Sequence, residues 1–126
     1  MIDRKNIVDG ILIEDVRYPD KYVIFNFYTW VELLKGIIVN YAKKSENEAE
    51  HLIMNDPLIH MPINNFRDVD FFSHELEYHW AMLIAYGPEY WTKGISARLP
   101  EDYMQWEENY IKEHKLAEDC FVYSDE

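Results

Sequence analysis

The longest apolar stretch of the sequence runs from Tyr22 to Tyr41 and must lie either in a membrane or at the centre of a folded core. Charged and amide side chains interrupt it at Asn26, Glu32, Lys35 and Asn40. Glu32 and Lys35 fall near its middle, where charged side chains are costly in lipid. The stretch therefore predicts the central element of a soluble domain, not a membrane span.

The composition fits one such domain over residues 1–126. Hydrophobic residues make up 48% of the chain and aromatic residues 16%, which supplies a core despite a formal charge of -12. Cys120 is the only cysteine, so an internal disulfide is impossible and a reducing compartment is expected. The first ten residues, MIDRKNIVDG, lack the apolar segment of a signal peptide. We therefore expect a cytoplasmic protein.

In the first half of the chain, the spacing of apolar residues predicts three helices. Residues 3–14 predict a short helix, and residues 22–42 a long buried one. The beginning of the second segment, YVIFNFYTW, is rich in residues that favour strands, so a strand over residues 22–28 is the alternative. The sequence SENE at 45–48 has the form of a capping box and predicts a helix that ends near Met54. The following residues, 55–65, predict a loop.

In the second half, Asn65 is the predicted cap of a helix from about Phe66 to Tyr86, which Gly87 and Pro88 end. Five apolar residues fall within roughly 40° of one line on this helix and predict its buried face. They are Val69, Phe72, Leu76, Trp80 and Leu83. Pro100 predicts the first position of a last helix, and residues 120–123 a short strand or an extended tail.

These elements predict a mostly α-helical single domain of four or five helices around an aromatic-rich core. The alternative is an α+β domain with a small sheet built from residues 22–28 and 120–123.

The segment HELEYHWAMLIAYGPEYW, from His74 to Trp91, raises the question of a metal site. A zinc-protease helix places two histidines four residues apart on one face. His74 and His79 are five residues apart, which turns their rings about 140° from each other on an ideal helix. Glu75 and His79 have a usable spacing, but two ligands do not make a site. We therefore expect neither a metal nor a cofactor.

Arg67 and His74 provide the enzymatic alternative. They resemble the Arg-x(4–6)-His pattern of small helical RNases of the HEPN class, and at seven residues apart they would lie about 20° apart on a helix. Asp68 follows the arginine, where that family usually has an uncharged or basic polar residue. Asp70 and Glu77 flank the pair and would repel a phosphate backbone.

Nucleophilic catalysis lacks its usual signals, since the sequence has no Gly-x-Ser-x-Gly elbow and no Gly-rich phosphate loop. Cys120 lies in the acidic segment AEDCFVYSDE, and nearby negative charge raises the pKa of a thiol and lowers its reactivity. We therefore expect a protein that is not an enzyme.

The negative charge is concentrated in the second half of the chain. Residues 1–62 carry seven basic and ten acidic residues, whereas residues 63–126 carry five and fourteen. Such a surface repels nucleic acid and suits a basic protein, to which tyrosine and tryptophan rings add contact area. The predicted partner-binding residues are Glu101, Asp102, Tyr103, Glu107, Glu108, Tyr90 and Trp91.

The segments HELEYHWAMLIAYGPEYW and LPEDYMQWEENYIKEH, in a small acidic chain, resemble bacterial immunity proteins of polymorphic-toxin and contact-dependent inhibition systems. These families share no motif, so the resemblance assigns no residue roles. It implies a cytoplasmic inhibitor that covers a basic toxin and binds neither nucleic acid nor membrane. A non-catalytic structural or interaction subunit is the remaining alternative.

Overall fold

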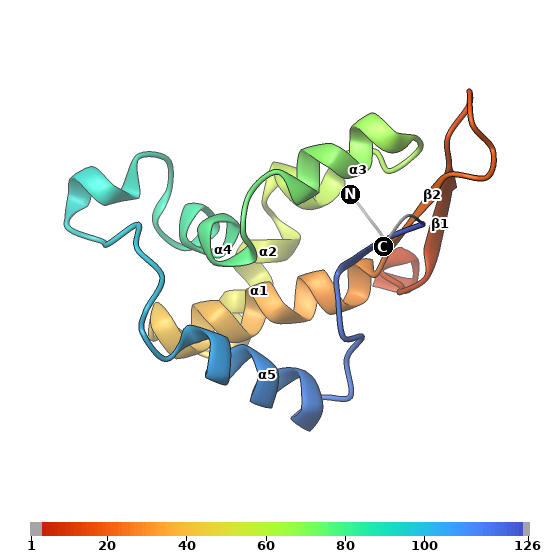
Figure 1. Cartoon of the computed structure of the whole chain (residues 1–126). Coiled ribbons are helices and arrows are strands. Elements are labelled where there is room, and N and C mark those ends of the chain that lie inside the picture. Colours follow the sequence, from red (N-terminus) through yellow and green to blue (C-terminus); the bar gives the residue numbers. More distant parts are fainter. Residues whose placement is uncertain (1–3, 125–126) are drawn as a thin grey trace.

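Residues 4–124, as described by a computed structural model, form five α-helices, three 3-10 turns and a three-stranded sheet (Figure 1). The strands are β1 (Ile11–Glu14), β2 (Tyr22–Phe25) and β3 (Phe121–Tyr123). The helices are α1 (Phe27–Tyr41), α2 (Glu46–Met54), α3 (Phe66–Ser73), α4 (Glu77–Tyr86) and α5 (Tyr103–Glu113). The 3-10 turns are η1 (Arg4–Asn6), η2 (Pro57–His60) and η3 (Tyr90–Lys93). The predicted mostly helical fold is confirmed, together with the small sheet of its alternative.

The sheet is antiparallel, in the order β1-β2-β3. Val23 and Phe25 of β2 are fully buried on the face that meets the helices. The register pairs Leu12 with Ile24 and Ile24 with Val122 on the opposite, more exposed face. Residues of alternating burial thus place one face of the sheet in the core.

The helix predicted over residues 3–14 is wrong for the described part of that range. Only η1 and β1 occur there, and Gly10 between them has a φ of +78°. That conformation favours glycine and lies outside any right-handed helix. Ile13 points to the core while Leu12 and Glu14 are exposed, which is the period of a strand. An apolar run of this length fits the period of a helix as well as that of a strand, and the pairing with β2 decides for the strand.

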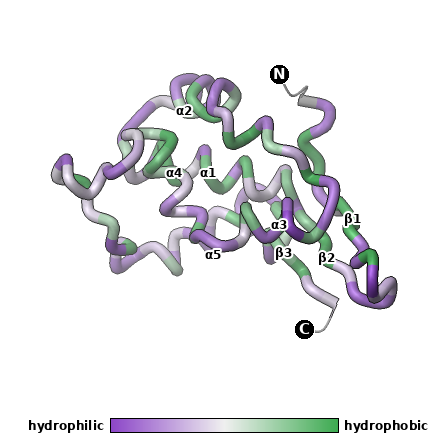
Figure 2. The backbone as a smooth tube through the Cα atoms, turned by 90° about the horizontal axis from the view of Figure 1, so that it is seen from above, coloured by the Kyte–Doolittle hydropathy of each residue, from purple (hydrophilic) through white to green (hydrophobic). Residues whose placement is uncertain are grey.

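Helix α1 is the central element and packs against α2, α4 and α5. Figure 2 shows it inside the molecule, with hydrophilic stretches of α5 and of the β1–β2 turn at the outside. The strand alternative is confirmed for Tyr22–Phe25, and the helix begins at Phe27. None of the helices in the described chain combines the length and the apolarity that crossing a membrane requires.

Asn26 separates β2 from α1 and joins three segments of the chain. Its buried side chain accepts a hydrogen bond from the backbone N–H of Gly10 (2.9 Å) and donates one to the carbonyl of Asp119 (2.7 Å). Its own backbone N–H donates to the carbonyl of Cys120 (2.7 Å). The amide oxygen is turned to Gly10, and the side chain makes no hydrogen bond that caps α1.

Asp9 supplies the missing cap from the preceding segment. Its carboxylate accepts hydrogen bonds from the backbone N–H and the hydroxyl of Thr29, both at 2.8 Å. The carboxylate thus lies at the positive end of the α1 dipole. The Thr29 hydroxyl in turn accepts from the backbone N–H of Ala117 (2.9 Å). Together with Asn26, these groups hold the segments before β1 and before β3 against the first turn of α1.

An aromatic cluster lies between the sheet and the helices. Phe25 of β2 stacks on Phe121 of β3, with ring centroids 4.7 Å apart. Its ring also contacts Phe27 of α1 and Phe72 of α3, each with centroids 5.3 Å apart. One strand residue therefore connects four elements of the core.

The single helix predicted from Phe66 to Tyr86 is wrong, because the chain breaks between α3 and α4. Leu76, predicted to be in the core, is extended (φ -69°, ψ 149°) and 58% exposed. Val69 and Phe72 before the break and Trp80 after it are buried, as predicted.

Side chains donate hydrogen bonds to carbonyls at the end of α3, in place of the backbone N–H groups that a next helical turn would supply. Nδ1 of His74 donates to the carbonyl of Phe71, and the indole N–H of Trp80 donates to the carbonyl of Phe72 (2.9 Å). Carbonyls at a helix end need partners of this kind. The break is therefore stabilised by two rings of the segment that follows it.

The predicted helix caps are confirmed. Ser45 and Glu48 form a reciprocal capping box, and the side chain of Asn65 accepts from the backbone N–H of Asp68 (2.9 Å). Gly87 ends α4 with a φ of +91°. The last helix begins at Tyr103, a turn later than Pro100 predicted.

Gly36 of α1 allows α5 to approach closely. A methyl group there would lie 2.5 Å from the Tyr110 ring, which is held between Trp106 (4.9 Å) and His114 (3.9 Å).

We predict that Gly36→Ala lowers the free energy of unfolding by about 1–3 kcal/mol. In a Tyr110→Ala background the same change should stabilise by up to ~1 kcal/mol, because alanine favours helix. Urea unfolding followed by circular dichroism measures both; equal effects in the two backgrounds would contradict the contact.

Candidate partner-binding surface

Helix α5 and its flanks are the most acidic part of the structure. Residues 101–119 contain seven acidic and two basic residues. Glu101 and Glu108 are exposed, as predicted, and Glu108 pairs with Nζ of Lys112 (3.1 Å). Asp102 is also exposed and accepts a hydrogen bond from the hydroxyl of Tyr41 (3.1 Å). Burial and this hydrogen bond raise the pKa of Tyr41 to about 12, so its proton stays in place at neutral pH.

One predicted contact residue of α5 faces the interior instead. Tyr103 is 4% exposed and packs between the rings of Tyr41 (6.0 Å) and Tyr78 (5.8 Å). Tyr103 is therefore a core residue, because the first turn of α5 buries its ring against α1 and α4. Glu107 is half-buried and partly accessible, so its contact with a partner stays a prediction.

The predicted pair at η3 is divided in the same way. Tyr90 is fully buried, and its hydroxyl is hydrogen-bonded to Nδ1 of His79 (2.9 Å). Trp91 is 49% exposed and stacks on the His79 ring, with centroids 6.2 Å apart. Tyr90 is thus a core residue and not a contact residue, whereas Trp91 remains available to a partner.

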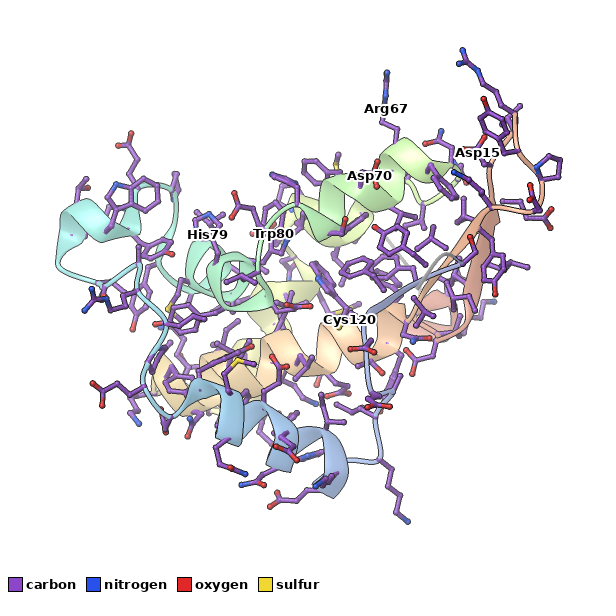
Figure 3. All side chains as sticks on the ribbon, viewed as in Figure 1. Asp15, Arg67, Asp70, His79, Trp80 and Cys120 are labelled. Atoms are coloured by element: carbon purple, nitrogen blue, oxygen red, sulfur yellow. The ribbon has the colours of Figure 1, made fainter. Side chains whose placement is uncertain are left out.

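Trp91 is one end of a continuous row of rings along α3, α4 and η3. The neighbouring centroids are 6.2 Å apart for Trp91 and His79, 6.3 Å for His79 and Trp80, and 5.5 Å for Trp80 and His74. Phe71 closes the row, 5.7 Å from His74 and 5.5 Å from Trp80. We call these five residues the aromatic row. Figure 3 shows His79 and Trp80 on the side of α4 that faces α3.

The aromatic row lies in acidic surroundings. Residues 66–93 contain five acidic and two basic residues. Asp70 and Glu89 are exposed, and a carboxylate oxygen of Glu75 lies 3.9 Å from Nε2 of His74. Lys93 is turned to the carbonyl of Tyr86 (3.5 Å). The surface around the rings is therefore negative on balance.

Sequence reasoning missed Phe71 and Leu76 as surface residues. The break after α3 exposes Leu76 and turns His74 onto Trp80. A signal was present in the neighbouring pair Phe71 and Phe72, because adjacent helical residues point about 100° apart and the predicted buried face contained only Phe72. The structure buries Phe72 and leaves Phe71 38% exposed.

Arg67 and His74, the pair of the RNase alternative, have different surroundings. Arg67 extends outward from α3 (Figure 3) and lines a cavity with Glu14 and Asp15. His74 instead folds over Phe71 and Trp80. The structure thus gives each of the two side chains its own set of neighbours.

The histidines of this region also have packing partners. His74 and His79 both contact the ring of Trp80. Within residues 4–124, no three His, Cys, Asp or Glu side chains are grouped so that they could hold a metal ion.

Cys120 directly precedes β3 and is 7% exposed. Burial raises the pKa of the thiol far above its ordinary range, and the carboxyl of Glu77 is the second-largest cause of this rise. Burial also raises the pKa of Glu77. The pKa of the thiol is thus raised in the predicted direction, but the causes are burial and the carboxyl groups of Glu77, Glu107 and Asp9, which are distant from Cys120 in the sequence.

Comparisons of the chain with protein-family models, with curated proteins and with solved structures find no match.

We predict that the Cys120 thiol is unreactive in the folded protein, because it is buried and protonated. Ellman's reagent should modify one thiol per chain only after denaturation. Cys120→Ala combined with Ala97→Cys provides the control, since residue 97 is exposed and its thiol should react at once. Complete native modification of the parent at the rate of that control would contradict the prediction.

Proposed function

We propose that the protein binds a basic protein partner in the cytoplasm and inhibits it, in the manner of immunity proteins. The observation that carries this proposal is the seven-to-two excess of acidic residues over positions 101–119. Asp102 is exposed, and so are five others of these acidic residues, namely Glu101, Glu108, Glu113, Glu118 and Asp119.

A surface of this kind acts mainly on association. Like charges on one face attract a basic partner over long distances and orient it before contact. The attraction is screened over about 8 Å at physiological ionic strength, so added salt weakens it. The same charges repel a nucleic-acid backbone, which favours a protein as the partner.

The test is the association rate of a partner isolated by affinity capture from the source cells. The variant Glu101→Gln, Glu113→Gln and Glu118→Gln removes three exposed charges on this surface. We predict that it associates roughly 3- to 10-fold more slowly at low salt. Salt should slow the parent protein more than the variant. Unfolding free energy should change little, because exposed charges contribute little to stability.

The matched control removes three exposed charges elsewhere, with Glu14→Gln, Asp20→Asn and Glu46→Gln on β1, the β1–β2 turn and α2. It has the same net charge as the test variant and should associate nearly as fast as the parent. Equal slowing by both variants would show that only total charge matters. The proposal is wrong if neither set of substitutions nor added salt changes the association rate.

A further inference from the structure

We propose that the aromatic row is the docking site for an arginine-bearing segment of the basic partner. This inference rests on the proposed function and adds to it a second face, on which the partner is held after the charges on α5 have attracted it.

The row combines exposure with continuity. Phe71 is 38% exposed and Trp91 is 49% exposed, and Leu76, which lies between His74 and His79 in the sequence, is 58% exposed. Trp80 is only 7% exposed and forms the floor between the two ends. Clustered aromatic rings with a buried centre are typical of the few residues that dominate binding energy at protein interfaces.

The rings are already fixed in place without a partner. The indole N–H of Trp80 is bonded to the carbonyl of Phe72, Nδ1 of His79 to the hydroxyl of Tyr90, and Nδ1 of His74 to the carbonyl of Phe71. A surface held in this way loses little conformational freedom on binding. The two exposed end rings, Phe71 and Trp91, contact the rings of Trp80 and His79, which these hydrogen bonds hold.

The chemistry of the surroundings favours arginine as the group that is bound. A guanidinium can stack flat on the exposed Trp91 or Phe71 ring and can bond a carboxylate through two N–H groups. Glu75 beside His74, and Asp70 one residue before Phe71, supply such carboxylates at the row. A lysine ammonium lacks the planar fork, and a phosphate would be repelled.

The acidic helix and the aromatic row can be told apart in one experiment. In Figure 1, α3 and α5 lie on opposite sides of α1. Trp80 and Trp91 belong to the row, Trp106 lies on α5, and Trp30 is fully buried in the core. The four indole N–H groups are therefore natural reporters of where a ligand binds.

The experiment is a titration of ¹⁵N-labelled protein at low salt with a decapeptide of alternating arginine and glycine, followed by the indole signals. We expect the signals of Trp91 and Trp80 to shift while that of Trp30 stays. A decapeptide of alternating lysine and glycine should bind the row about two- to fivefold more weakly. An oligouridylate of similar length should cause no shift.

Substitutions then test the row itself. In Phe71→Ala, followed at Trp91, and in Trp91→Ala, followed at Trp80, the dissociation constant should rise about two- to fivefold. Met104→Ala is the control, because Met104 is 69% exposed on α5 and should not change the titration. Unchanged far-UV circular dichroism shows that each variant is folded.

Three outcomes would overturn the inference. The first is a shift of the Trp106 signal alone. The second is that Phe71→Ala and Trp91→Ala bind the arginine peptide as tightly as the parent does. The third is that the oligouridylate shifts the signals of the row. The first two leave the proposed binding of a basic partner through α5 standing, and the association kinetics above decide that proposal separately.

Discussion

The buried side chain of Asn26 is the interaction on which the rest of the structure depends. Its hydrogen bonds to Gly10 and Asp119 join segments that are 16 and 93 residues away in the sequence. A buried amide without such partners would cost about 1–3 kcal/mol, so the network favours a single arrangement. With Asp9 as its remote cap, α1 is fixed against the sheet at one end, and α2, α4 and α5 pack around it.

The orientation of α4 then determines which residues reach the surface. Ala81 and Met82 of α4 are buried, and the indole of Trp80 donates to the carbonyl of Phe72. This packing of α4 requires a break in the chain after α3, so the two segments do not form one continuous helix. The break exposes Leu76 and lines up rings from three elements. Contiguous exposed apolar side chains rimmed by polar residues are typical of surfaces that bind a partner.

Sequence reasoning succeeded where the signal is local and failed where distant packing decides. The caps at Ser45 and Asn65 could be predicted, since each needs only a side chain and the next turn. Strand β1 could not, because its apolar run fits both periods until β2 pairs with it. Of the candidate site, Trp91 and the exposed acids of α5 were predicted, whereas Tyr90 and Tyr103 were misplaced because tertiary contacts bury them.

We propose that a basic partner docks on the aromatic row while the acidic helix α5 mainly guides it there. Hydrogen exchange of the complex with the captured partner tests this docking most directly. We expect slowed exchange over residues 70–80 and 89–93, where backbone amides would lie under the docked partner. The segment 103–113 should show a smaller change. Slowed exchange confined to α5 or to the β1–β2 hairpin, with residues 70–93 unchanged, would contradict it.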